Sequence, residues 1–109
     1  MATMPNPETG TRVIEDTDAQ KEPPYHLILL DDDYHTYQYV VAMLHAVFGY
    51  GPDKGFAIAC VVDSQGEAIV MTGGHEEVSN KQQLIHSYGA DPMMSTSVGS
   101  MSAVIEPAA

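Results

Sequence analysis

Three consecutive carboxylates, at residues Asp31–Asp33, are the residues of this chain whose types and spacing most clearly suggest chemistry. They follow the apolar run Tyr25–Leu30, which is typical of a short buried strand that a preceding proline pair prevents from extending backwards. A helical pattern begins at Thr36, so the aspartates lie in a strand-to-helix turn, where turn preference favours such residues. At about 5 Å and an effective dielectric of about 20, each like-charge pair costs roughly 3 kcal/mol when desolvated. Either the cluster is fully solvated or a positive group binds there.

Helical and strand-like segments must position these carboxylates. Thr36 is a favourable N-cap for the helical pattern that follows it, and Gly49 is a natural stop. Pro52 suits the first turn of a second helix, which Gly66 ends, and Gly89 is expected to cap a third. The order β-α-α-β-α-β predicts an α+β fold, with a small three-stranded antiparallel sheet and three helices packed on one side. The predicted helices cover residues 36–48, 52–63 and 75–88, and the predicted strands cover 25–30, 68–72 and 101–105.

Length and composition allow one small domain. The chain has 109 residues and a net charge of −11, which argues against nucleic acid as a partner. Residues 1–24 are rich in proline and acidic side chains and lack apolar periodicity, so we expect a disordered N-terminal arm there. No apolar run approaches the length of a membrane helix, so no membrane partner is expected. The single cysteine, Cys60, excludes a disulfide framework and suits a reducing cytoplasm.

Several short motifs follow one another in a fixed order between Pro23 and Glu106. The Pro-Pro-Tyr start, the apolar strand and the acidic turn are followed by Tyr-x-Thr and by a helical segment that contains Tyr-Val-Val. Ala59, Val62 and Gly66 then form Ala-x-x-Val-x-x-x-Gly, and the chain later carries a Glu…Lys pair and a terminal Val-Ile-Glu. In this order and spacing, the motifs resemble the ClpS family of Clp protease adaptors.

The resemblance implies a monomeric, non-enzymatic and cytoplasmic adaptor, with no cofactor and no catalytic or metal-binding residue. Its folded core would span residues 25–109. Such an adaptor binds the N-terminal residue of a substrate protein, an N-degron. It then delivers the substrate to a Clp-type AAA+ unfoldase, or modulates that unfoldase, and through it acts on the Clp protease.

The resemblance also implies three sets of site residues. A substrate α-ammonium, with a pKa of about 7.7–8.0, is mostly charged at neutral pH and offers three hydrogen-bond donors, which suits a ring of carboxylates. For the side-chain pocket the open alternative is ordinary core packing, and for the docking pair it is an exposed pair too far apart to interact. The implied residues are Asp31, Asp32 and Asp63 for the α-amine; Tyr37, Val40, Ala59, Val62 and Met101 for the side-chain pocket; and Glu76 and Lys81 for docking on the unfoldase.

The chain departs from the family pattern at four of these positions. The family usually has Asn at position 31 and His at position 63, and both are Asp here. If Asp31, Asp32 and Asp63 converge, the acidic triad would hold an amine more strongly, raise the pKa of one carboxyl, or recruit a hard cation such as Mg²⁺ or Ca²⁺. Tyr37 and Ala59 stand where the family usually has Met, so an altered substrate preference is expected.

The competing interpretation is a receiver-like or divalent-cation-binding signalling module that uses the Asp31–Asp33 cluster. A carboxylate pair after the first strand would there bind Mg²⁺. The remaining chain is too short for five β-α units of ordinary length, and no strand pattern leads into Asp63 as a phosphoacceptor. The five histidines lack metal-ligand spacing. The adaptor interpretation is therefore preferred.

Overall fold

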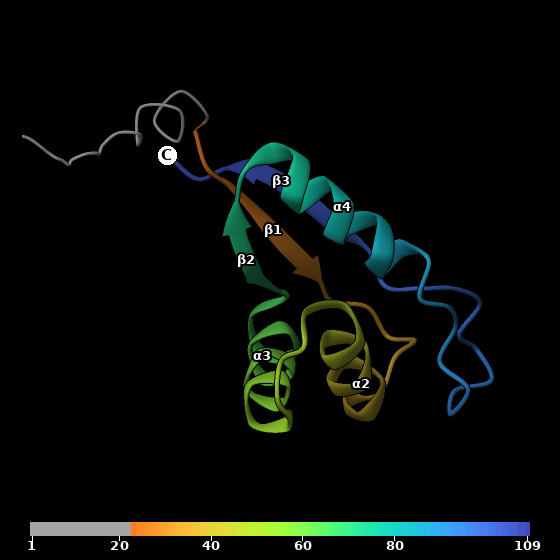
Figure 1. Ribbon diagram of the computed structural model, residues 1–109. Coiled ribbons are helices and arrows are strands. Elements are labelled where there is room, and N and C mark those ends of the chain that lie inside the picture. The colour runs from red at the N-terminus through yellow and green to blue at the C-terminus, as the bar shows by residue number, and fades with distance from the viewer. Residues whose placement is uncertain (1–22) are drawn as a thin grey trace, which may run out of the picture.

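The computed structural model describes residues 23–109, so the arm expected over 1–24 lies, apart from its last two residues, outside the described part. A central strand opens the fold, two helices follow, and a strand, a helix and a final strand complete it (Figure 1). The elements are β1 (Tyr25–Leu30), α2 (Tyr37–Phe48), α3 (Pro52–Gln65), β2 (Glu67–Gly73), α4 (His75–His86) and β3 (Ala103–Pro107). The predicted α+β class and element order are confirmed.

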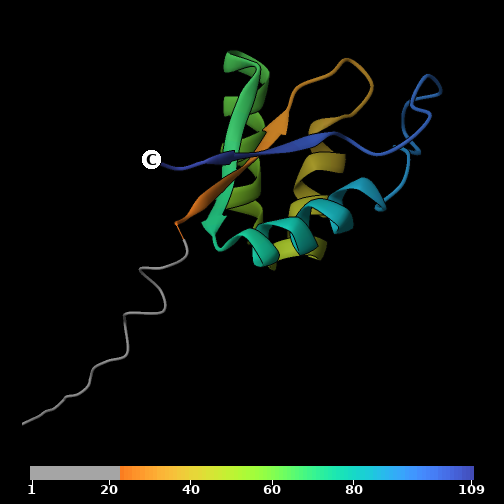
Figure 2. The ribbon, with the colours of Figure 1, turned by 90° about the horizontal axis from the view of Figure 1, so that it is seen from above.

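The three strands form one antiparallel sheet in the order β2-β1-β3, with β1 in the centre. Leu27 and Leu29 of β1 are completely buried, and they face the core together with Val70 of β2 and Ala103 of β3. Figures 1 and 2 show α2 and α3 lying side by side, with α4 running along the sheet near β3. The helices thereby cover the face of the sheet that carries the leucines.

The caps of α2 form as the sequence predicts. The Thr36 side chain accepts a hydrogen bond from the Tyr39 backbone N–H at 3.1 Å, which satisfies one of the free donors at the helix start. Gly49 ends the helix with φ 76°, a left-handed conformation that glycine adopts without strain. Between these caps the helix turns Tyr39, Val40, Met43, Leu44 and Val47 into the core.

Three elements differ from their predicted ranges by two residues, the two helices at one end and the last strand at both. Helix α3 runs on to Gln65, directly before the predicted stop at Gly66, whose N–H donates to the Val62 carbonyl. Helix α4 ends at His86 with Ser87 as its cap, and Gly89 instead belongs to the loop that follows. The last strand covers 103–107 and not 101–105, because its register is set by pairing along β1, where Leu29 opposes Ala103. Met101 lies before the strand with its side chain buried.

Candidate functional site

The acidic turn is anchored on both sides at the end of β1. The Leu30 N–H donates to the Ser102 carbonyl at 3.0 Å, and the Asp31 N–H donates to the Gly66 carbonyl at 2.9 Å. Gly66 caps α3, and Asp63 lies in the last turn of that helix. The turn and the C-terminal end of α3 are therefore held at the same end of the sheet, although they are far apart in the sequence.

Within the turn, the aspartates have different surroundings. Asp31 and Asp33 are exposed, whereas the Asp32 side chain is only 26% exposed. An Asp32 oxygen accepts a hydrogen bond from the Tyr34 N–H at 2.9 Å, and the same carboxylate lies 2.8 Å from the His35 ring nitrogen Nδ1. Turn geometry and a histidine therefore hold Asp32 in place.

Asp63 is engaged by a tyrosine from the neighbouring helix. The Tyr37 hydroxyl donates to an Asp63 oxygen at 2.7 Å and so joins the first turn of α2 to the last turn of α3. This hydrogen bond is the largest of several causes that raise the pKa of Tyr37 to about 12. The Tyr37 hydroxyl thus occupies one oxygen of the Asp63 carboxylate.

The structure lends no support to the cation-binding alternative. Within residues 23–109, no group of three or more His, Cys, Asp or Glu side chains is arranged so that it could hold a metal ion. A sheet of three antiparallel strands also differs from the parallel sheet that repeated β-α units would build. The receiver-like interpretation is set aside on both grounds.

The five residues expected to line a side-chain pocket belong to the hydrophobic core or pack against it. Four of them, namely Val40, Ala59, Val62 and Met101, are 2–5% exposed and belong to the main hydrophobic cluster. Tyr37 is half-buried and packs against this cluster. In the structure as it stands, these residues are in contact with the core, and Tyr37 is the member that reaches the surface.

An apolar groove of about 390 Å³ runs beside Tyr37 on the outer side of α2. The Phe56 ring, from α3, forms one wall and lies 5.4 Å from the Tyr37 ring, measured between centroids. Phe56 is 53% exposed. Sequence reasoning does not find it as a surface residue, because its helical spacing with Ala59 is typical of the core. Gln38, Val41 and Ala42 complete the lining.

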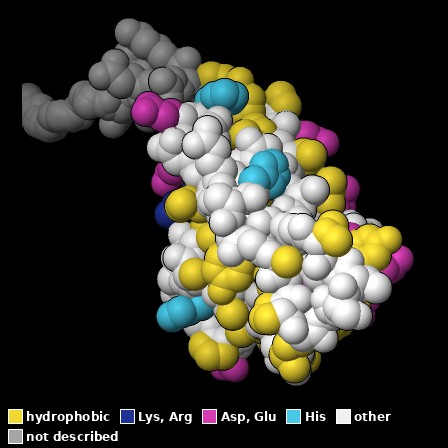
Figure 3. Space-filling view, turned by 90° about the vertical axis from the view of Figure 1, so that its right-hand side faces the viewer, with side chains coloured by type: hydrophobic (Ala, Val, Ile, Leu, Met, Phe, Trp, Pro, Cys, Tyr) yellow, Lys and Arg dark blue, Asp and Glu magenta, His cyan; other side chains and the backbone are white. Residues whose placement is uncertain are grey.

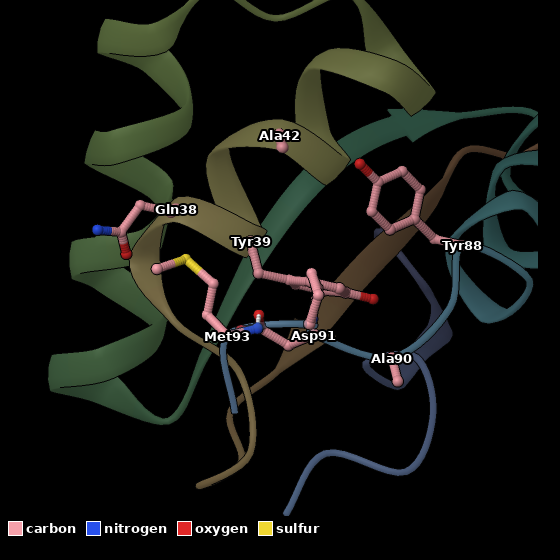
Figure 4. Close-up of a pocket in the computed structure, with 8 residues that line it drawn as sticks. Gln38, Tyr39, Ala42, Tyr88, Ala90, Asp91 and Met93 are labelled. Atoms are coloured by element: carbon pink, nitrogen blue, oxygen red, sulfur yellow. Dashed lines mark hydrogen bonds between the residues drawn. The ribbon is translucent and has the colours of Figure 1, made fainter. Parts of the chain in front are cut away.

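A second residue that sequence reasoning does not find is Asp91, whose side chain is almost fully buried beside a cavity of about 190 Å³ (Figure 4). Its carboxylate accepts hydrogen bonds from the backbone N–H groups of Thr36 at 2.6 Å and Met93 at 2.9 Å. Burial raises the pKa of this carboxyl, but the hydrogen bonds from Thr36 and Met93 and the nearby His35 together outweigh burial and hold the pKa below its usual value. Asp91 thereby fixes the start of α2, where the acidic turn ends. The available signal was Asp91-Pro92, a typical turn pair.

The two residues expected to dock on an unfoldase lie on α4 in different surroundings. Glu76 is exposed in the first turn and borders a shallow depression with Glu77 and Asn80. The Lys81 ammonium donates to the Val47 carbonyl at 3.0 Å, so it binds the C-terminal end of α2. None of the helices within residues 23–109 is long and apolar enough to cross a membrane.

Comparison with known proteins agrees with this fold. The sequence model of the family described as ATP-dependent Clp protease adaptor protein ClpS matches residues 20–95. The ClpS adapter protein of Streptomyces coelicolor is 32% identical over 81 residues, which cover 72% of this chain and 84% of that protein. That of Cupriavidus metallidurans is 30% identical over 90 residues, covering 81% and 82% respectively.

Among solved structures, Agrobacterium tumefaciens ClpS2 bound to L-phenylalaninamide superposes with a TM-score of 0.68 at 23% identity. The match covers 79% of this chain and 98% of that one. The fold therefore places the chain in a class of small α+β domains that it shares with this structure. With the matching family model and relatives, the chain belongs to the ClpS family of ATP-dependent Clp protease adaptors.

Proposed function

We propose that this protein is a non-enzymatic cytoplasmic adaptor that binds the N-terminal residue of substrate proteins. It presents them to a Clp-type AAA+ unfoldase, or modulates that unfoldase, and through it acts on the Clp protease. Membership of the ClpS family supports the adaptor role. The ligand of the similar Agrobacterium structure, L-phenylalaninamide, carries a free amine beside an apolar side chain and has the chemistry of such an N-terminal residue.

The observation that supports the proposal is the position of the acidic turn at the end of β1, beside the C-terminal end of α3. The bond from the Asp31 N–H to the Gly66 carbonyl holds the turn beside the end of α3, the helix whose last turn carries Asp63. A charge-assisted hydrogen bond to a carboxylate contributes about 1.5–3 kcal/mol. The net charge of −11 favours a positively charged ligand, although the acidic side chains visible in Figure 3 lie only at the margin of that face.

Binding of the first side chain requires Tyr37 to move. Val40, Ala59, Val62 and Met101 are buried, and Tyr37 is the half-buried residue at the surface of this group. Displacing its hydroxyl from Asp63 would open the way to these residues and would free the Asp63 carboxylate for the amine. Access to the pocket and access to the third carboxylate are thereby coupled. The groove beside Phe56 would receive a neighbouring apolar part of the same segment.

The experiment is a binding screen with peptides that differ only in their first residue, each with a free or an acetylated N-terminus. We expect the free peptides to bind at least about tenfold more tightly. Equal binding of both forms would contradict the proposal. Asp31→Asn combined with Asp63→His restores the usual family residues and should shift the preference towards peptides that begin with Leu or Phe.

Unfoldase docking is proposed to involve Glu76 and Lys81. Glu76 is the exposed member, so a charge reversal there acts on the surface and leaves the core unchanged. Glu76→Lys should weaken binding to the unfoldase and leave peptide binding intact, and Glu77→Lys is the matched control in the same turn. An unfoldase that binds both variants and the wild type equally would rule out this docking face.

A further inference from the structure

His35 lies between the acidic turn and the loop that precedes β3. Its side chain is only 4% exposed. The ring nitrogen Nδ1 is 2.8 Å from Asp32 Oδ1 and 3.0 Å from Asp32 Oδ2. On the opposite side, Nε2 is 2.8 Å from the Gly99 carbonyl oxygen and 3.3 Å from the Ser97 hydroxyl oxygen. The ring also packs on Tyr39, with the centroids 4.5 Å apart.

The short contacts with Asp32 and Gly99 determine how many protons the His35 ring carries. A carboxylate and a backbone carbonyl can only accept hydrogen bonds, whereas a neutral imidazole has one donor and one acceptor nitrogen. With a single proton, one ring nitrogen would direct its lone pair at an oxygen. Only the imidazolium form, with an N–H at both nitrogens, satisfies the Asp32 and the Gly99 contact together.

The groups around the ring favour a positive charge. Asp32 faces it from the turn, and Asp91 lies on the loop side, where the His35 charge is one of the smaller causes that lower the pKa of Asp91. From α2 the ring meets Tyr39, an aromatic face that also suits a cation. The ionisable groups near His35 therefore include two carboxyls and a phenol.

We propose that His35, as an imidazolium, is the positioning residue of the amine site: it fixes the Asp32 carboxylate and ties it to the carbonyl of Gly99. The inference rests on the proposed function, in which Asp32 receives the substrate amine. A carboxylate that is already held in one orientation loses less conformational freedom on binding. The Tyr34 N–H and the ring occupy one side of Asp32, and the exposed part of the carboxylate remains for the ligand.

The first test reads the protonation state of the ring directly in the free protein. A long-range ¹H–¹⁵N correlation spectrum at neutral pH distinguishes a doubly protonated ring from either neutral tautomer. We expect both nitrogens of His35 to be protonated. His45, an exposed residue of α2, serves as the comparison. A singly protonated His35 ring would overturn the inference whatever the peptide measurements show.

The second test compares peptide binding by the wild type with that by His35→Asn. Asparagine keeps a donor near the position of Nδ1 but carries no charge and does not reach Gly99. We expect about tenfold weaker binding of free-amine peptides and unchanged binding of acetylated ones. His45→Asn is the matched control and should behave as the wild type.

Acetylated peptides separate positioning from a purely structural role. A loss of affinity that is equal for free-amine and acetylated peptides would show that His35→Asn only perturbs the fold, and it would overturn the inference. Equal binding of free and acetylated peptides by the wild type would instead overturn the proposed function.

Discussion

Side chains of opposite charge lie at the two ends of helix α2, and they differ in how far they are bound by other groups of the protein. At the N-terminal end lie the carboxylates of Asp32 and Asp91, and at the C-terminal end lie Lys81 and Lys54. Both arrangements suit the helix macrodipole, which favours anions at the start and cations at the end of a helix. Figure 1 shows that the N-terminal end faces the acidic turn and the loop before β3.

At the C-terminal end of α2, the charged and aromatic side chains bind other groups of the protein. The rings of Phe48 and Tyr50 stack with centroids 4.9 Å apart, and Lys54 places its ammonium 3.8 Å above the Tyr50 ring. Lys81 covers Phe48 and donates to Val47, while the Tyr50 hydroxyl donates to the Val70 carbonyl at 2.7 Å. The N-terminal end instead leaves exposed carboxylates in the turn. We call the C-terminal end closed, because its side chains are bound within the protein and stabilise the fold. We call the N-terminal end open, because its exposed carboxylates can bind a ligand.

The largest effect is expected at the buried carboxylate of the N-terminal end. Asp91→Asn removes one of the acceptors that satisfy the Thr36 and Met93 N–H groups. Since leaving buried donors unsatisfied is costly, the free energy of unfolding should fall by about 2–3 kcal/mol. Urea denaturation measures this. Asp33→Asn, at an exposed residue, should change it by less than about 0.5 kcal/mol.

Asp91 should also make the free energy of unfolding depend on pH in the acidic range. Its pKa is held below the usual value in the folded state, so its contribution is complete above the unfolded-state pKa of about 3.9. That contribution is lost as the pH falls through the lower pKa of the folded state. A denaturation series from neutral to acidic pH should show a shallower loss for Asp91→Asn. Identical slopes for both proteins would contradict the assignment.

Removing the Tyr37 hydroxyl tests whether its hydrogen bond to Asp63 competes with ligand binding at the N-terminal end of α2. Tyr37→Phe breaks the bond to Asp63, so free-amine peptides should bind more tightly, by a factor of about two to ten, the equivalent of one net hydrogen bond. The variant should also lack the tyrosine that titrates at about pH 12 in an absorbance titration. Weaker binding would show that the hydroxyl contacts the ligand and does not compete with it.

The smallest effect is expected at the closed end. Lys54→Met removes a partly exposed cation–π contact with Tyr50, which contributes about 0.5–1 kcal/mol to stability. Peptide binding should not change, because the residue lies at the far end of α2. A thermal melt together with the peptide titration checks both statements. A marked loss of peptide binding would contradict the division between the two ends.

Local signals predicted the parts of the fold that depend on neighbouring residues. Thr36, Gly49 and Gly66 act as caps because each meets the few residues next to it in the sequence. Gly89 carries the same kind of signal, yet α4 ends earlier and the Gly89 N–H instead donates to the Ser100 hydroxyl. The start of β3 follows its register against β1, which no local pattern encodes.

The same distinction divides the candidate site. Asp31–Asp33 are consecutive, so the sequence alone reveals them, and the family resemblance adds Asp63. The contacts that organise the turn are distant in sequence: Asp91 caps a helix that starts 55 residues earlier, and the Gly99 carbonyl is 64 residues from His35. Neither contact has a periodic or local signature, so sequence reasoning misses both.

The most direct measurement is a double cycle that combines Asp32→Asn with acetylation of the peptide N-terminus. If the Asp32 carboxylate binds the amine, acetylation should weaken binding to the wild type by about ten- to a hundredfold and weaken binding to Asp32→Asn far less. Asp33→Asn should resemble the wild type. An equal effect of acetylation on the wild type and on Asp32→Asn would contradict amine binding at the end of β1.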